Sequence, residues 1–466
     1  MACHAGAAGL LLLSLSAELA VAWVPHRPAS PLPRSATRAG AAVAGAGAPN
    51  VIDSLKGCEA FERVNPMSDI FVMKGFHHVE LYTADATHTA ARWSFGLGMP
   101  VVARSGPATG NSACSSVLLQ SGGMRFLFSA PLRNGTGCPL RGYDADAAAA
   151  FVAKHGVAVR AVGLEVEDAR EAYERCVAAG GVGVLPPYAM AATDDVGGDA
   201  GDSGESVWVA EVQLYGDVVL RFVSTGGYDG AFLPGFEAED GARTDETFGL
   251  KRLDHLVGNV WELLPRANYV AQSTGLHQFA EFTAEDVGTV DSGLNSLVLA
   301  SNDGNVLLPM NEPTYGTRRK SQIQTYLEQN EGEGVQHMAL LTDDIFTTIR
   351  SIRSMTRFGG FQLMGRPSDE YYRELPGRLG DALTPDEYAQ VEELGLLADL
   401  DDAGVLLQVF TRPVGDRPTL FLEIIQRIGC IDEKGAQEAG CGGFGKGNFR
   451  ELFKSVEDFE ASLKMS

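Results

Sequence analysis

The sequence has little of what marks several classes of protein. Only seven of its 466 residues are cysteine, and they form no CxxC pair and no dense framework. This pattern is typical of cysteines that stay reduced, and it argues against a zinc module or a disulfide scaffold. Basic residues are also scarce, since 37 Lys and Arg stand against 60 Asp and Glu. The formal net charge of -23 opposes binding to nucleic acid or to an anionic membrane.

Acidic residues are missing from most of the first fifty positions. Residues 10–23, LLLLSLSAELAVAW, form an apolar run too short to span a bilayer, and Ala20-Val21-Ala22 has the spacing of a signal cleavage site. The following tract, to residue 50, is rich in Arg, Ser, Pro and Ala and has no Asp or Glu. We interpret residues 1–50 as a bipartite signal and transit leader that is removed, which predicts a plastid location. A cytoplasmic location, ordinary secretion and a disordered tail are the alternatives.

No later segment is long and apolar enough to be a membrane anchor.

One short sequence motif occurs more than once in the chain. HVELYTAD begins at His78 and HMALLTDD at His337, and related strand-like segments begin at residues 161 and 255. Each start is followed by a segment with helical signals and then by short strands, which predicts a βαβββ module. We therefore expect an α+β protein of four βαβββ modules, paired into two half-barrel domains.

The predicted boundaries follow from composition. The two domains are expected at residues 70–225 and 250–466, joined by a Gly-rich and acidic linker at 226–249. A second loop of low complexity occupies residues 193–206. Helical signals at 367–399 indicate an insertion in the fourth module.

Three residues of the second half have the chemistry of a metal site. His255 and His337 occupy the same position in two modules, and each lies in an apolar strand. Glu423 lies in FLEII, where an ionised carboxylate is costly unless it is paired or bound to a cation. Core histidines and a buried ion pair with Arg427 are the alternatives. Two imidazoles and one carboxylate on one face are the facial triad of non-haem Fe(II).

The first half of the chain provides an internal comparison. At the corresponding positions it has His78, Ala161 and Arg221, so only one of the three ligand types remains. We expect the first half to keep the fold without a metal, and His78 to be structural.

Four long motifs carry a resemblance to a known family. LDHLVGN, NEPTYGTRRKSQIQTYLEQNEGEGVQHMAL, LLQVFTRPVGDRPTLFLEIIQR and GCGGFGKGNFRELFKS resemble the 4-hydroxyphenylpyruvate dioxygenase family, which has the vicinal oxygen chelate fold. The resemblance implies Fe(II) bound by His255, His337 and Glu423. It also implies a substrate pocket formed by seven further residues, Ser296, Asn311, Gln322, Gln408, Phe410, Phe444 and Phe449.

The resemblance implies a defined reaction, the conversion of 4-hydroxyphenylpyruvate and O2 to homogentisate and CO2. No separate 2-oxoglutarate is then required, and the activity belongs to tyrosine and phenylalanine catabolism, supplying a precursor of plastoquinone and tocopherol. Hydroxymandelate synthase, which acts on the same substrate, and a non-catalytic glyoxalase-like binding protein are the alternatives. We also expect a homodimer.

The end of the chain joins a glycine-dense stretch to one amphipathic helix. GCGGFGK, residues 440–446, lacks the Ser or Thr of a phosphate-binding loop, so we interpret it as a hinge. The helix that follows carries Phe449 and Phe453 on its apolar face. We expect it to be a lid over the site, and a fixed helix that completes the core is the alternative.

Overall fold

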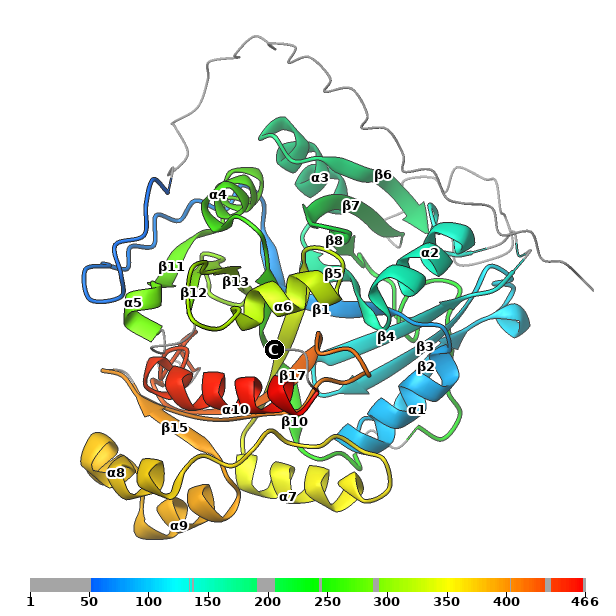
Figure 1. Ribbon diagram of the computed structural model, residues 1–466. Coiled ribbons are helices and arrows are strands. Elements are labelled where there is room, and N and C mark those ends of the chain that lie inside the picture. The colour runs from blue at the N-terminus through cyan, green and yellow to red at the C-terminus, as the bar shows by residue number, and fades with distance from the viewer. Residues whose placement is uncertain are drawn as a thin grey trace, which may run out of the picture. The chain divides into compact units, whose positions relative to one another are not determined.

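The computed structural model describes residues 52–133, 135, 138–190, 206–242, 245–287, 293–402, 404–431 and 437–463. All of them belong to one compact unit, Ala48–Ser466 (Figure 1). The predicted leader and nearly all of the predicted loop at 193–206 lie outside the described residues. No helix in the described part of the chain has the length and hydropathy needed to cross a membrane.

The first half forms a nine-stranded sheet in the order β6-β7-β8-β5-β1-β4-β3-β2-β9. Its strands are β1 (Met73–Tyr82), β2 (Val101–Ser105), β3 (Cys114–Ser121), β4 (Met124–Pro131), β5 (Ala158–Val166), β6 (Gly183–Met190), β7 (Val207–Tyr215), β8 (Val218–Ser224) and β9 (Glu237–Ala238). Its α-helices are α1 (Ala86–Leu97), α2 (Ala145–His155) and α3 (Ala169–Ala178).

The second half forms an eight-stranded sheet in the order β11-β12-β13-β10-β14-β17-β16-β15. Its strands are β10 (Leu250–Asn259), β11 (His277–Phe282), β12 (Leu294–Ala300), β13 (Leu307–Pro313), β14 (Gly334–Thr342), β15 (Leu397–Leu400), β16 (Gly404–Phe410) and β17 (Phe421–Gly429). Its α-helices are α4 (Leu263–Thr274), α5 (Ala284–Val287), α6 (Gln322–Gln329), α7 (Ile345–Thr356), α8 (Asp369–Leu379), α9 (Pro385–Glu393) and α10 (Phe449–Ser462).

The central strands of the two sheets pair in the same pattern. In the first, β1 pairs parallel with β4 and antiparallel with β5, and β5 pairs parallel with β8. In the second, β10 pairs parallel with β13 and antiparallel with β14, and β14 pairs parallel with β17. The α+β fold of four βαβββ modules in two half-barrels is therefore confirmed. The predicted domain boundaries stay a prediction, and β9 lies inside the predicted linker, where it pairs with β2.

The aspartate of the repeated motif caps a helix. Asp85, Asp168 and Asp344 each precede a helix, and each side chain accepts hydrogen bonds from backbone N–H groups of the first turn. These bonds satisfy donors that have no partner within the helix. The aspartate seven residues after the module start therefore marks the place where the strand gives way to a helix in three of the four modules.

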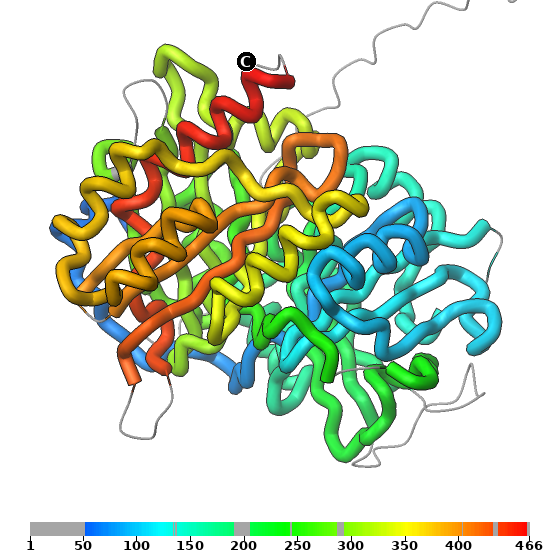
Figure 2. The backbone as a smooth tube through the Cα atoms, turned by 90° about the horizontal axis from the view of Figure 1, so that it is seen from below, coloured from blue at the N-terminus to red at the C-terminus, as the bar shows by residue number. Residues whose placement is uncertain are grey.

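The insertion predicted to be helical at 367–399 is mostly helical, but residues 397–399 belong to β15. It contains α8 and α9, and Thr384 forms a capping box with Glu387 at the start of α9. Figure 2 shows this segment and the strands that follow it, in yellow to orange, on the left of the view, and the blue and cyan segments of the first half on the right.

The expectation that the cysteines stay reduced is wrong for one pair. Cys430 and Cys441 form a disulfide, whereas Cys58, Cys114, Cys138 and Cys176 are free. A count of CxxC pairs does not detect a single bridge between the end of β17 and a glycine-rich turn, because the fold alone brings these two sulfurs together.

Candidate metal centre

His255, His337 and Glu423 meet on three adjacent strands. In the register of the sheet, His255 pairs with Ala339, and Ala339 pairs with Glu423. His337 lies two residues before Ala339 and so faces the same side of the sheet. One ligand atom from each of the three side chains lies within 4.8 Å of the other two. The three residues are only 5%, 9% and 3% exposed, so their side chains are largely shielded from bulk water.

The hydrogen bonds around the triad fix which atoms face its centre. His255 Nε2 and His337 Nε2 lie 3.2 Å and 3.4 Å from the same carboxylate oxygen, Glu423 Oε2. The other ring nitrogens are used elsewhere, because His255 Nδ1 contacts Asp254 Oδ1 at 2.9 Å and His337 Nδ1 contacts Gln336 Oε1 at 3.0 Å. When Nδ1 carries the proton, the neutral ring presents an Nε2 lone pair that can bind a cation in place of the hydrogen bond to Glu423.

The ionisation of the triad suits a divalent metal. Burial raises the pKa of Glu423, but hydrogen bonds with His255 and His337 outweigh it and bring the pKa to about 2. Burial lowers the pKa of His337 and keeps that ring neutral. Burial also lowers the pKa of His255, but the hydrogen bonds with Asp254 and Glu423 outweigh burial and raise it, so a metal ion would displace a proton from this ring. One carboxylate and two imidazoles thus fit non-haem Fe(II), with positions left for other ligands.

A buried ion pair contacts the His255 ring at Nδ1, the nitrogen that faces away from Glu423. Arg427 donates to Asp254 through Nε at 3.0 Å and through a terminal nitrogen at 2.7 Å, and both side chains are almost fully buried. Burial raises the pKa of Asp254, but Arg427 outweighs burial and holds that pKa well below its usual range. Asp254 therefore stays ionised, and it orients the His255 ring in the way that carboxylates orient metal-binding histidines.

The equivalent place in the first half holds a cation of the protein itself. Register pairs His78 with Gly163 and Gly163 with Arg221, so Arg221 corresponds to Glu423. The Arg221 guanidinium contacts Glu80 at 2.7 Å, Glu211 at 2.8 Å and His78 Nε2 at 3.0 Å. Among the described residues, the second-half triad is the only group of three His, Cys, Asp or Glu side chains close enough to share a metal.

Two of the predicted pocket residues lie on neighbouring strands, and one of them, Asn311, is connected to the triad. Ser296 on β12 pairs with Asn311 on β13, and Asn311 pairs with Asn259 on β10. The Asn311 amide donates to Asn259 at 3.3 Å and to Gln336 Oε1 at 3.5 Å. Because Gln336 Oε1 also contacts His337 Nδ1, hydrogen bonds connect Asn311 through Gln336 to one candidate metal ligand.

The two predicted glutamines lie on different elements. Gln408 on β16 is 2% exposed, and its Oε1 has no hydrogen-bond partner in the described part of the protein. An unpaired buried amide oxygen is costly, so a bound ligand with a donor would stabilise it. Gln322 is the first residue of α6, and it lines a small cavity together with Gln336 and Phe421, whose ring stacks on His337.

The three predicted phenylalanines surround these groups. Ring centroids place Phe444 5.4 Å from His255, Phe410 6.0 Å from His337 and Phe449 5.5 Å from Phe282. Phe444 also lines a cleft of about 880 Å³ between the glycine-rich segment and β11. Phe444 thus lies between the cleft and the ring of His255. The structure brings all ten predicted residues to one region, and their individual roles stay predictions.

Sequence reasoning missed Asp254, Gln336 and Asn259, and it considered Arg427 only as a partner for Glu423. Asp254 and Gln336 directly precede His255 and His337 in the chain. A polar residue next to each predicted ligand was therefore a usable signal. The pairing of Asp254 with Arg427 was not accessible, because 173 residues separate them.

A buried carboxyl group on α10 predicts that the docking of this helix depends on pH. Glu460 is 7% exposed, and burial, reinforced by repulsion from Glu457, raises its pKa from 4.5 to about 7, against the opposing effects of Lys320 and Thr325. The folded protein thus binds this proton more tightly than the unfolded chain. Its stabilising effect is complete below about pH 4.5 and is lost as the pH rises to about 7. We expect hydrogen exchange in α10, corrected for intrinsic rates, to be about tenfold faster at pH 8 than at pH 5.

The matched variant is Glu460→Gln, which keeps the shape and removes the titration. We expect exchange in α10 to lose most of its pH dependence in this variant. An unchanged pH dependence in Glu460→Gln would show that another group is responsible.

Curated relatives resemble the chain over most of its length. A 4-hydroxyphenylpyruvate dioxygenase from Daucus carota is 53% identical over 421 residues, which cover 88% of this chain and 92% of the relative. A protein of the same name from Arabidopsis thaliana is 52% identical over 427 residues, covering 88% and 93%. One from Yarrowia lipolytica is 33% identical over 398 residues, covering 83% and 92%. No protein-family model matches the chain.

Solved structures agree with this result. A mutant of 4-hydroxymandelate synthase from Streptomyces coelicolor superposes with a TM-score of 0.67 at 25% identity, covering 84% of this chain and 99% of that one. A fusion of a xylose isomerase-like TIM barrel with 4-hydroxyphenylpyruvate dioxygenase shares the fold, with a TM-score of 0.59 at 20% identity over 84% of this chain and 53% of that one. By its similarity to the curated relatives over nearly nine-tenths of its length, this chain belongs to the 4-hydroxyphenylpyruvate dioxygenase family.

Proposed function

We propose that the chain is an Fe(II)-dependent dioxygenase that converts 4-hydroxyphenylpyruvate and O2 to homogentisate and CO2. The observation that carries the proposal is the convergence of His255 Nε2 and His337 Nε2 on one oxygen of Glu423. The name of the relatives at 52–53% identity supports the choice of substrate. The donor set of two nitrogens and one oxygen supports Fe(II) as the metal.

The protein's own groups have three tasks in this reaction. His255, His337 and Glu423 would hold the iron, which when bound supplies the redox chemistry with O2. The buried amides of Asn311, Gln322 and Gln408, together with the Ser296 hydroxyl, orient the substrate by hydrogen bonds, and the unpaired Gln408 Oε1 is ready to accept one.

The aromatic residues have the third task. Phe410 and Phe444 pack against the two metal-binding rings, and Phe449 closes the side next to Ser296 through Phe282. Together they provide an apolar surface for the substrate ring and exclude water. Movement of α10 as a lid stays a prediction.

Hydroxymandelate synthase is the second candidate, because a mutant of that enzyme is among the structural neighbours. It is less well supported, since that neighbour is 25% identical whereas the dioxygenase relatives reach 53%. A binding protein without catalysis is less well supported, because the relatives at 52–53% identity are named as dioxygenases.

One experiment separates these functions. The protein is reconstituted anaerobically with Fe(II), mixed with 4-hydroxyphenylpyruvate and exposed to O2, and oxygen uptake and products are measured. We expect uptake with homogentisate and CO2. Formation of 4-hydroxymandelate would identify the second candidate, and the absence of oxygen uptake would favour the binding protein.

We further propose that residues 1–50 direct the chain to a plastid, because they combine a short apolar run with an acid-free tract. A fluorescent protein fused after residue 50 is expected to accumulate in plastids of a host with such organelles. Fluorescence that stays in the cytosol would contradict the targeting proposal and leave the enzymatic one intact. A homodimer stays a prediction, and light scattering of the purified protein would test it.

A further inference from the structure

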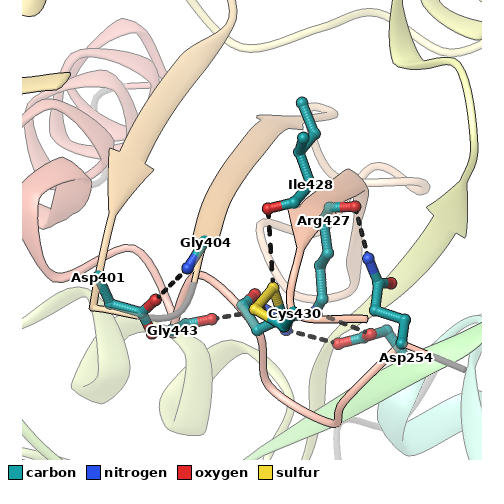
Figure 3. Close-up of a disulfide and its surroundings, with 9 residues drawn as sticks. Asp254, Asp401, Gly404, Arg427, Ile428, Cys430 and Gly443 are labelled. Atoms are coloured by element: carbon teal, nitrogen blue, oxygen red, sulfur yellow. Dashed lines mark hydrogen bonds and ion pairs between the residues drawn. A yellow bond between two sulfur atoms is a disulfide. The ribbon is translucent and has the colours of Figure 1, made fainter. Parts of the chain in front are cut away.

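A disulfide joins the end of β17 to the glycine-rich segment, defined here as residues 440–447. Cys430 follows β17, and Cys441 lies in the segment, 11 residues further along the chain (Figure 3). Because β17 carries Glu423, the bridge ties the segment to a strand that supplies a metal ligand. Catalysis as proposed above involves no cysteine, so the bridge has a role that the reaction does not explain.

The glycine-rich segment packs closely against the pocket. Gly440, Gly442, Gly443 and Gly445 all have φ near +70°, a conformation that glycine adopts without strain. A Cβ atom at Gly442 would lie 2.7 Å from the backbone nitrogen of Leu406, and one at Gly445 would lie 2.6 Å from the Gln408 amide. The segment therefore touches the predicted substrate-binding glutamine through its own backbone.

Arg427 connects the same segment to His255. Its guanidinium donates to the carbonyl oxygens of Cys441 and Gly443, the latter at 2.7 Å, while it also holds Asp254. Asp254 in turn contacts the His255 ring. Figure 3 shows Arg427 between Asp254 and the disulfide-bonded turn. The disulfide thus holds in place the Cys441 and Gly443 carbonyl groups that bind Arg427. Through Asp254, Arg427 in turn helps to position His255.

We propose that Cys430 and Cys441 are a thiol–disulfide exchange site, at which a dithiol reductant loosens the glycine-rich segment and weakens substrate binding. The dithiol supplies two electrons and two protons, the bond between the Cys430 and Cys441 sulfurs breaks, two thiols form, and the reductant becomes a disulfide. Cys430 is only partly buried, whereas Cys441 is 3% exposed, so Cys430 is the half of the bridge at which we expect a reductant to attack.

Reduction loosens the glycine-rich segment because glycine residues have many backbone conformations available to them. Without the bridge, a segment with four left-handed glycines regains many backbone conformations, and ordering it again opposes substrate binding. The contacts of this segment with Gln408 and, through Phe444, with His255 are the ones that weaken. Because this effect on binding rests on the proposed function, its test includes a readout that does not require turnover.

The full chain is compared in its oxidised form and after treatment with an excess of a small dithiol, with free thiols counted by alkylation and mass measurement. We expect two additional thiols, at Cys430 and Cys441, and hydrogen exchange in residues 440–447 that is about tenfold faster. We also expect KM for 4-hydroxyphenylpyruvate to rise about tenfold, equivalent to about 1.4 kcal/mol of binding free energy.

The variant Cys430→Ser/Cys441→Ser should behave as the reduced protein does, whether or not dithiol is present. The matched control is Cys138→Ser, which removes a free thiol of the first half and should keep the full response. Equal exchange rates in both redox states, or a response that persists in the double variant, would overturn the proposal. If the oxidised, iron-loaded protein forms no homogentisate, the proposed function fails, and hydrogen exchange still decides the proposal on the disulfide.

Discussion

Replacing Glu423 with alanine is expected to lower the affinity for Fe(II) more than about 100-fold and to abolish oxygen uptake. Replacement of residues that only orient metal ligands costs 10–100-fold in affinity or activity, so loss of a ligand is expected to exceed that range. The carboxylate also provides the only negative charge of the triad. Affinity is measured by competition with a chelator under anaerobic conditions, independently of turnover.

The matched control is His78→Ala in the first half. His78 corresponds to His255 in register, but it contacts Arg221 at 3.0 Å and not a site for a metal. We expect this variant to bind Fe(II) like the parent and to lose about 1–3 kcal/mol of stability, because a buried guanidinium loses one partner. Full activity of Glu423→Ala, or loss of iron from His78→Ala, would contradict the assignment.

The second large effect is expected at Arg427. Arg427→Met leaves the carboxylate of Asp254 buried without its cation, and breaking such a pair costs about 3–5 kcal/mol. We expect a lower free energy of unfolding in denaturant titrations. We also expect weaker binding of Fe(II), since Asp254 no longer holds the His255 ring in one orientation.

The double variant Asp254→Asn/Arg427→Met tests the cause of that loss. It removes both charges, so stability should recover by at least about 1 kcal/mol relative to Arg427→Met. Affinity for Fe(II) should stay low, because the carboxylate that orients His255 is still missing. Equal stability of the single and double variants would show that the lost charge pairing is not the cause.

Much of the fold was accessible from the sequence because the chain repeats itself. The phrase at His78 and His337 predicted equivalent strands, and β1, β5, β10 and β14 are related in that way. The aspartate of the phrase was visible as well, although its role as a helix cap appears only in the structure. The candidate ligands followed from strand periodicity, since histidines at equivalent positions of paired strands face the same side.

The remaining features depend on contacts between distant residues. Nothing local to Arg427 shows that it pairs with Asp254 and not with Glu423. The order of strands decides this, because β10 and β17 flank β14. The segment that begins at Ile52 was likewise unassigned, and it exchanges hydrogen bonds with Asn268 on α4. Tertiary contacts of this kind have no periodic signal in the sequence.

The two halves carry charges of opposite sign at equivalent positions of the described strands. The first half places the Arg221 cation between two carboxylates, Glu80 and Glu211. In the second half the carboxylate is at the centre, as Glu423, and register puts Phe410 where the first half has Glu211. The charges are thus inverted between the two halves. The first half thus contains its own cation, and we expect the second half to bind one.

Anomalous diffraction from crystals of the iron-loaded protein, recorded on both sides of the iron absorption edge, tests this account most directly. We predict one iron peak for each chain, bonded to His255, His337 and Glu423, and no peak beside Arg221 in the first half. A peak in the first half, or iron bound by other side chains while the triad is vacant, would contradict it.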